Sequence, residues 1–125
     1  MKQKNVFKLD STDEQAVDLF VKLGMPKNMA KTLMYLSQVE ECCSSEIEQG
    51  TDLRQPEVSI AMQELIRKKW VKKHTKKSEG KGRPVHIYQP VLPLNDIWTN
   101  FHQEKMDYIG NIEQNFTNLR TLVSD

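Results

Sequence analysis

The sequence predicts a mainly α fold with a small β-hairpin (α+β): four helices, the hairpin and a long C-terminal helix. Three patterns support this prediction. Apolar residues recur every three or four positions as far as residue 69, alternate with polar residues between 70 and 90, and then follow heptad spacing to residue 123. The chain has 125 residues, 38% hydrophobic and 28% charged, which is typical of one globular domain with an appended element. We expect an arm over 1–10, a domain over 11–91 and a terminal helix over 92–125.

Two helices are predicted at the start of the domain. Ser11 and Glu14 fit a capping box, in which a serine and a glutamate three residues later cap the first turn. Gly24 ends this helix, because glycine readily adopts the conformation that terminates helices. Pro26 can open the second helix, since proline is tolerated in a first turn. The predicted buried face of the second helix is Met29, Leu33, Leu36 and Val39.

A short third helix and a longer fourth helix follow. Ser45 and Glu48 fit a second capping box, and Gly50 is predicted to stop the third helix. After a turn, the fourth helix is expected over about 54–69, because Pro56 fits only its first turn. The predicted buried face of the fourth helix is Val58, Ala61, Met62, Leu65 and Ile66.

The pattern then changes to that of a β-hairpin. Two runs of alternating residues, 70–76 and 84–90, predict strands that are joined by a tip over 78–83. Pro84 and Pro90 bound the second strand, because proline lacks the amide hydrogen that a central strand position donates.

A long amphipathic helix is predicted from Pro93 to about residue 123. Its apolar residues step alternately by three and four, which is the heptad spacing of helices that pair. Such a helix has little core of its own to cover, so we expect it to pair with a second copy; the alternative is that it folds back onto its own domain. The predicted dimerisation residues are Trp98, Phe101, Tyr108, Ile109, Ile112, Phe116, Leu119 and Val123.

Positive charge is concentrated in one segment of a chain whose formal net charge is only +1. Residues 67–83 contain nine Lys and Arg against Glu79 alone, a net charge of +8. The other 108 residues carry nine basic and 16 acidic side chains, a net charge of −7. This division indicates a localised surface for a polyanion, and the alternative is a solvated lysine-rich loop.

The order of these elements is that of a winged helix-turn-helix. In this fold the second of two short helices fits the major groove of DNA, and the hairpin follows the phosphates or enters the minor groove. The +8 segment falls on the end of that helix and on the hairpin, which favours DNA over the solvated loop.

The stretch 26–90 also resembles prokaryotic winged-helix transcriptional regulators. Gln55-Pro56-x-Val58-Ser59 is similar to the helix of the arsenical-resistance regulator (ArsR) type, and the run 80–84, Gly-Lys-Gly-Arg-Pro, is similar to the wing of archaeal TrmB and MarR-like regulators. In that pattern a long polar or basic residue often follows Val-Ser, whereas this chain has Ile60. The resemblance implies a DNA-binding transcription regulator whose C-terminal helix dimerises.

The exposed side of the fourth helix is the predicted base-reading surface. Glutamine can bond adenine N6 and N7 together, which makes Gln55 and Gln63 the leading candidates. Ile60 either contacts a thymine methyl group or packs on a neighbouring helix. Glu57 either complements the helix dipole or accepts from cytosine N4. The predicted recognition-helix set is Arg54, Gln55, Glu57, Ser59, Ile60, Gln63 and Arg67, and the predicted wing set is Lys72, Lys76, Lys77, Lys81 and Arg83.

The function predicted from these features is that of a homodimeric, sequence-specific transcriptional regulator that binds double-stranded DNA as an inverted repeat. One alternative is a winged-helix protein-interaction module of a transcription or replication assembly, because a fold does not fix a function. A weaker alternative is a nonspecific, chromatin-like DNA binder. The sequence indicates no cofactor and names no operator or small-molecule effector.

Metal binding and catalysis find little support in the sequence. Alignment with metal sensors of the ArsR type places Cys43 on the first ligand but Ser45 on the second, which makes a poor soft-metal site. We predict no metal, and for Cys42 and Cys43 thiol redox sensing and plain helix-end packing stay open. His74 and His86 are placed across the hairpin from each other, where strand packing explains them. Motifs of phosphate loops, zinc proteases and serine hydrolases are absent, so no enzyme is predicted.

The sequence also predicts where the protein works. A membrane-spanning helix needs about 18 consecutive apolar residues, and no stretch of this sequence approaches that length. The first residues also lack the apolar run of a signal peptide. The two cysteines cannot form a disulfide framework. We therefore expect a cytoplasmic protein that does not span a membrane.

Overall fold

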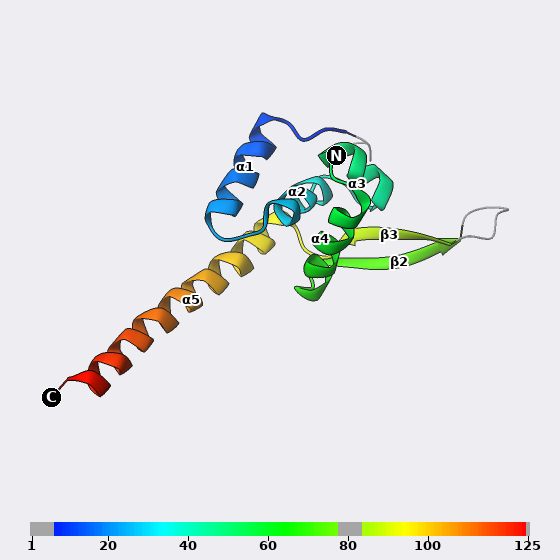
Figure 1. Cartoon of the computed structure of the whole chain (residues 1–125). Coiled ribbons are helices and arrows are strands. Elements are labelled where there is room, and N and C mark those ends of the chain that lie inside the picture. Colours follow the sequence, from blue (N-terminus) through cyan, green and yellow to red (C-terminus); the bar gives the residue numbers. More distant parts are fainter. Residues whose placement is uncertain (1–6, 78–83, 125) are drawn as a thin grey trace. The chain divides into compact units, whose positions relative to one another are not determined.

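The computed structural model describes residues 7–77 and 84–124, and the chain divides into two compact units, 1–93 and 94–125 (Figure 1). Within the described residues the helices are α1 (Ser11–Lys22), α2 (Lys27–Leu36), α3 (Ser44–Thr51), α4 (Gln55–Arg67) and α5 (Leu94–Val123), and the strands are β1 (Cys42–Cys43), β2 (Val71–Lys77) and β3 (Pro84–Pro90). A mainly helical unit with a small antiparallel sheet is followed by one long helix. The predicted fold class is confirmed.

The core of the first unit forms around α2, which packs against α1, α3 and α4. Leu33, Tyr35 and Leu36 of α2 are almost completely buried, as are Ile47 of α3 and Leu65 of α4. Burying an apolar side chain of this size stabilises the fold by roughly 1.5–3 kcal/mol. This cluster therefore fixes the positions of α3 and α4.

The helix α1 begins one residue earlier than predicted, because its capping residue is Asp10 rather than Ser11. The Asp10 carboxylate accepts a hydrogen bond from the backbone N–H of Asp13 at 2.8 Å, and the Asp13 carboxylate accepts one from the backbone N–H of Asp10 at 2.9 Å. Two overlapping residue pairs satisfy the capping rule, and the structure uses the earlier one.

The described part of the N-terminal arm packs against α2 and the end of α3. The ring of Phe7 stacks on the ring of Tyr35, with centroids 4.4 Å apart. Lys8 Nζ donates to Asp52 Oδ1 at 2.8 Å. Both contacts join residues that are far apart in the sequence.

The N-cap of α3 lies two residues before the predicted one. The N-cap is Cys43, whose backbone N–H donates to Glu46 Oε1 at 2.9 Å. Ser45 therefore lies inside the first turn. The prediction failed here because it paired Ser45 with the second of two glutamates instead of using the first.

Gly50 does not stop α3, contrary to the prediction. The helix continues to Thr51 and ends at Asp52, which has a left-handed conformation with φ of 60°. Gly50 is instead a point of close approach between elements. A Cβ atom there would overlap the ring of Tyr35 and lie 2.5 Å from the backbone oxygen of Phe7.

Two further helix ends differ from the prediction. The helix α2 ends at Leu36, and Val39 is buried in the following turn, where its N–H donates to the oxygen of Leu36 at 3.3 Å. The helix α4 ends at Arg67, and Lys69 turns the chain toward β2 with a φ of 67°. Apolar spacing predicted that Val39 is buried but not where the helix ends, because a residue can reach the core from a turn.

The strands β2 and β3 form the predicted hairpin, and β1 adds a third strand in the order β1-β3-β2. With only two residues, β1 is too short to show a period. The register places His74 opposite Ile87 and His86 opposite Thr75. The expected pairing of His74 with His86 is therefore wrong by one position, and their side chains lie on opposite faces of the hairpin. The hairpin tip over 78–83 lies outside the described residues.

The helix α5 is the predicted long C-terminal helix. Ile97 and Phe101 near its start are buried, whereas the side chains from residue 106 to residue 124 are all exposed. In the part of the chain that the structure describes, no helix combines the length and the apolar character needed to cross a membrane.

We expect Gly50→Ala to lower the free energy of unfolding by about 1–3 kcal/mol, because the added methyl group forces α3 away from Tyr35 and Phe7. Gly110→Ala is the matched control. A Cβ atom at Gly110 meets nothing within 4 Å, so this change should stabilise the helix by roughly 0.5–1 kcal/mol. Chemical denaturation measures both changes, and wild-type stability of Gly50→Ala would contradict the packing role.

Candidate nucleic-acid interface

The helices α3 and α4 form a helix-turn-helix pair that is connected by residues 52–54 (Figure 1). Asp52 adopts the left-handed conformation, which aspartate tolerates better than most residues. Leu53 is buried and anchors the turn. The Glu57 carboxylate accepts a hydrogen bond from the backbone N–H of Arg54 at 2.8 Å and so caps the start of α4. These contacts fix the direction in which α4 leaves the turn.

One side of α4 is a polar strip. Val58 and Leu65 are at most 1% exposed and hold the other side of the helix in the core. Gln55 and Gln63 are exposed, Ser59 is half-buried, and the three recur every four residues. Residues at this spacing share one side of a helix. The structure thus brings the two leading base-reading candidates together on one surface.

Ile60 lies next to the polar strip in the sequence and is 64% exposed. It lines a shallow hollow together with residues at the start of α2, and packing there leaves most of its side chain uncovered. An exposed apolar side chain at this place is available to a thymine methyl group or to an apolar group of another partner.

The charged residues at the ends of α4 are held by their neighbours. Arg54 Nε lies 3.9 Å from Glu57 Oε1. Arg67 donates to Glu64 Oε1 at 2.7 and 3.2 Å, and this hydrogen bond lowers the pKa of the Glu64 carboxyl. The carboxylate of Glu57 is engaged in capping, which agrees with its helix-terminal role rather than with cytosine recognition.

The lysines of β2 are divided between the two faces of the hairpin. Because successive strand residues alternate, Lys72, His74 and Lys76 share one face and Lys73 lies on the other. Glu41 lies 3.7 Å from both His74 Nε2 and Lys76 Nζ, so one of the predicted wing cations faces a negative charge. The remaining predicted wing contacts lie outside the described residues or side chains: Lys77, Lys81 and Arg83.

Shallow hollows adjoin α4, and two of them are lined by residues of the polar strip. One, of about 260 Å³, is lined by Gln55 and Ser59 together with residues of α3 and β3. The other is lined by Gln63 together with residues of β2. The polar residues of the two linings that lie outside the predicted DNA-binding sets include Ser44, Ser45, Lys69, Lys73, His86 and Tyr88. Strand alternation could have indicated that His86 and Tyr88 share a face, but only the fold places them beside α4.

The two cysteines have different environments. Cys42 is 1% exposed, and burial, reinforced by the charge of Glu46, raises the pKa of its thiol to about 12. Cys43 is half-buried, and its sulfur lies 3.2 Å from Ser45 Oγ. Among residues 7–77 and 84–124, no group of three or more His, Cys, Asp or Glu side chains could hold a metal ion.

Most of the predicted dimerisation residues of α5 form an exposed apolar set. Their exposed fractions run from 39% for Ile112 to 69% for Val123. Phe101 is the exception: it is 5% exposed and does not belong to the free face of the helix. The exposed members are Trp98, Tyr108, Ile109, Ile112, Phe116, Leu119 and Val123.

Comparison with solved structures agrees with this arrangement. The chain aligns with TrmBL2, an archaeal chromatin protein whose structure shows a novel mode of DNA binding, with a TM-score of 0.50 and 14% sequence identity. The alignment covers 90% of this chain and 43% of the TrmBL2 chain. The fold is a winged helix-turn-helix. This winged helix therefore spans less than half the length of the TrmBL2 chain that it matches.

Two further structures align less well. Pex from Synechococcus sp. strain PCC 7942 gives a TM-score of 0.44 and 19% identity over 86% of this chain and 88% of that chain. The transcriptional regulator PA4135 gives a TM-score of 0.47 and 16% identity over 90% of this chain and 79% of that chain. No protein-family model and no curated protein matches the sequence. The likeness to solved structures concerns the fold alone.

We expect a chromogenic disulfide reagent to modify Cys43 rapidly in the native protein and Cys42 only after unfolding. A thiol pKa of about 12 leaves Cys42 about a thousandfold less thiolate than an ordinary thiol, and burial limits access to it. Cys43→Ser should remove the fast reaction, whereas Cys42→Ser should retain it. Equal reaction rates of both thiols in the native protein would contradict this assignment.

Proposed function

We propose that this chain is a sequence-specific, DNA-binding transcriptional regulator that acts as a homodimer. The observation that carries the proposal is an exposed polar strip on α4 next to the only strongly basic segment of the sequence. The remaining 108 residues have a net charge of −7. A basic surface on an otherwise acidic molecule orients its approach to a polyanion.

In this proposal α4 is the recognition helix and enters the major groove. From Gln55 to Gln63 the strip spans about 12 Å of helix, enough to face several neighbouring base pairs. The amide groups of Gln55 and Gln63 can each bond adenine on two atoms, and Ser59 can donate or accept. The helix thus presents groups that read bases by hydrogen bonds rather than by charge.

The hairpin is proposed to bind the phosphates or the minor groove. Its proposed contacts are Lys72, Lys76, Lys77, Lys81 and Arg83. Each phosphate that is neutralised contributes roughly −0.9 to the slope of log affinity against log salt. The sequence resemblance to ArsR, MarR and TrmB-like regulators supports the same assignment.

A protein-interaction module of a transcription or replication assembly is the second candidate. It is favoured by Ile60, which is 64% exposed on α4, because protein interfaces use apolar anchors that become buried on binding. A module of this kind would bind DNA without preference for any base, or not at all. The test of base recognition below therefore separates the two candidates.

We propose that the free face of α5 pairs with the same face of a second copy. Ile109, Ile112, Phe116, Leu119 and Val123 repeat at steps of three and four and are all exposed in the single chain. Two such helices bury these side chains in one seam. A two-fold dimer would present two α4 helices to an inverted repeat.

Gln63→Ala is expected to relax the preference at one base pair by about 1–3 kcal/mol, because the amide reads that base directly. The preferred duplex is first selected from a random pool, and binding to it and to its single-base variants is then measured by fluorescence anisotropy. Equal loss of affinity on the selected and on random duplexes would contradict the reading role.

The matched variant is Lys81→Ala combined with Arg83→Ala. It should weaken binding to all duplexes alike and flatten the salt slope by up to about 2, because the two cations contact phosphates and not bases. An unchanged slope would remove these residues from the interface.

Replacing both Ile112 and Phe116 by Glu is expected to convert the dimer into a monomer, because the charges would have to be buried in the seam. Gln114→Glu is the control, since Gln114 lies outside the heptad seam and bonds Asn118 instead. Analytical ultracentrifugation measures the mass. A monomeric wild type, or a dimer that survives the double substitution, would contradict the proposal.

A further inference from the structure

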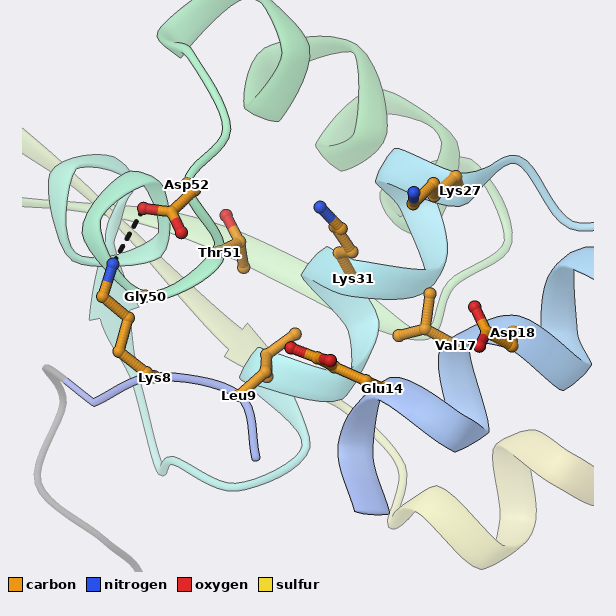
Figure 2. A pocket seen from close by; sticks show the side chains of 10 residues that line it. All are labelled: Lys8, Leu9, Glu14, Val17, Asp18, Lys27, Lys31, Gly50, Thr51 and Asp52. Carbon is orange, nitrogen blue, oxygen red and sulfur yellow. Dashed lines mark hydrogen bonds and ion pairs between the residues drawn. The ribbon is translucent and has the colours of Figure 1, made fainter. Parts of the chain in front are cut away.

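A pocket of about 400 Å³ lies in the first unit, between the N-terminal arm, α1, α2 and the end of α3 (Figure 2). Its volume falls within the roughly 300–1,000 Å³ of small-molecule sites and far exceeds the ~30 Å³ of one water molecule. Of the residues proposed to bind DNA or to dimerise, none that the structure describes lines this pocket. It is therefore a separate feature of the domain.

Opposite charges line the two helical walls of the pocket. Glu14 and Asp18 lie four residues apart on α1, and Lys27 and Lys31 lie four residues apart on α2, so each pair occupies one side of its helix (Figure 2). The helices α1 and α2 pack against each other. Within the described part of the chain, none of these four side chains forms an ion pair.

The other two charges in the pocket already satisfy each other. Lys8 Nζ donates to Asp52 Oδ1 at 2.8 Å, and this bond, helped by the charges of Lys8 and Lys31, lowers the pKa of the Asp52 carboxyl. Among the described lining residues, the charged groups that form no ion pair are two carboxylates on one wall and two ammonium groups on the other. The two carboxylates and Lys27 are exposed, and Lys31 is half-buried. They have a net charge of zero but are separated in space.

We propose that this pocket binds a small amino acid, with its ammonium group at Glu14 and Asp18 and its carboxylate at Lys27 and Lys31. A dicarboxylate would meet the like charges of α1, and a diamine would meet those of α2. A molecule with one charge of each sign complements both walls, since a charge-assisted hydrogen bond is available at each end. Buried Val17 gives the pocket an apolar floor between the two walls.

The pocket also touches the turn that leads into the recognition helix. Its lining includes Thr51 and Asp52, and Asp52 supplies the left-handed residue between α3 and α4. A ligand held by Lys31 beside this turn would bias the position of α4. This regulatory consequence rests on the proposed function, whereas binding itself does not. The test below contains no DNA, so failure of the site and failure of the proposed function are distinguishable.

Isothermal titration of the whole chain with glycine, β-alanine and γ-aminobutyrate tests the proposal, because these probes carry the same charges at increasing separation. Succinate and putrescine are the probes with two like charges. We expect at least one amino acid to saturate the protein and to bind at least tenfold more tightly than succinate or putrescine. Saturation by no amino acid, or equally tight binding of succinate or putrescine, would overturn the proposal.

Two variants locate the site. Lys31→Met and Glu14→Gln remove one charge from each wall with little change of shape, and each should weaken binding of the best amino acid at least tenfold. Lys22→Met and Glu40→Gln remove the same charges outside the pocket and should leave its affinity unchanged. Circular dichroism checks that all four variants are folded. Wild-type affinity in both pocket variants, or equal losses in the control variants, would also overturn the proposal.

Discussion

The close approach of α3 to α2 at Gly50 is the constraint on which the rest of the first unit depends. Without a side chain at Gly50, the ring of Tyr35 and the backbone of Phe7 both reach α3. That contact brings the arm across the domain, where Lys8 meets Asp52. Asp52 in turn sets the direction of α4. The absence of a Cβ atom at Gly50 thus allows the contacts that join the core, the N-terminal arm and the turn before α4.

Acidic side chains form ion pairs with several of the basic residues on or near the candidate interface. Glu57 lies beside Arg54, Glu64 holds Arg67, and Glu41 faces Lys76. Exposed ion pairs of this kind contribute only about 0–1 kcal/mol to stability, so they are weak as structural supports. Their larger effect is to offset positive charge locally, on α4 through Glu57 and Glu64 and on β2 through Glu41. In the proposed complex this leaves hydrogen bonds as the main interaction of the polar strip on α4.

Long local patterns made much of the fold predictable from the sequence. Three patterns repeat several times within one element: the heptads of α5, the alternation in β2 and β3, and the helical spacing of buried residues in α4. The helical spacing of α4 also predicts that Gln55 and Gln63 share its polar strip. Features without a local repeat were missed. The strand β1 has two residues, and the stacking of Phe7 on Tyr35 joins positions that no pattern links.

In the candidate site, too, contacts between residues far apart in the sequence could not be predicted. Alternation along β2 places Lys72 and Lys76 on the face opposite Lys73, but only the strand register decides which residues of β3 share each face. The pairing of His74 with His86 failed for this reason, since an error of one residue exchanges the two faces. Glu41 was not predicted either, because its neighbours in space lie more than thirty positions along the chain. The charges of a site can be counted from sequence, but their arrangement depends on pairing.

The length and exposure of α5 favour a partner for this helix, whether or not the protein binds DNA. The helix is about 45 Å long and is exposed from residue 106 onward, and it contains Gly110 together with several asparagines of low helix propensity. Isolated helices are marginal in water, and most helical stability in proteins comes from packing an apolar face. The apolar residues of α5 repeat at heptad spacing along one seam, which a straight solvated helix does not require. In the proposed dimer a second α5 supplies an identical seam and buries the apolar face that one chain leaves exposed. The two-fold axis of such a pair would also relate two copies of α4, as an inverted repeat of DNA requires.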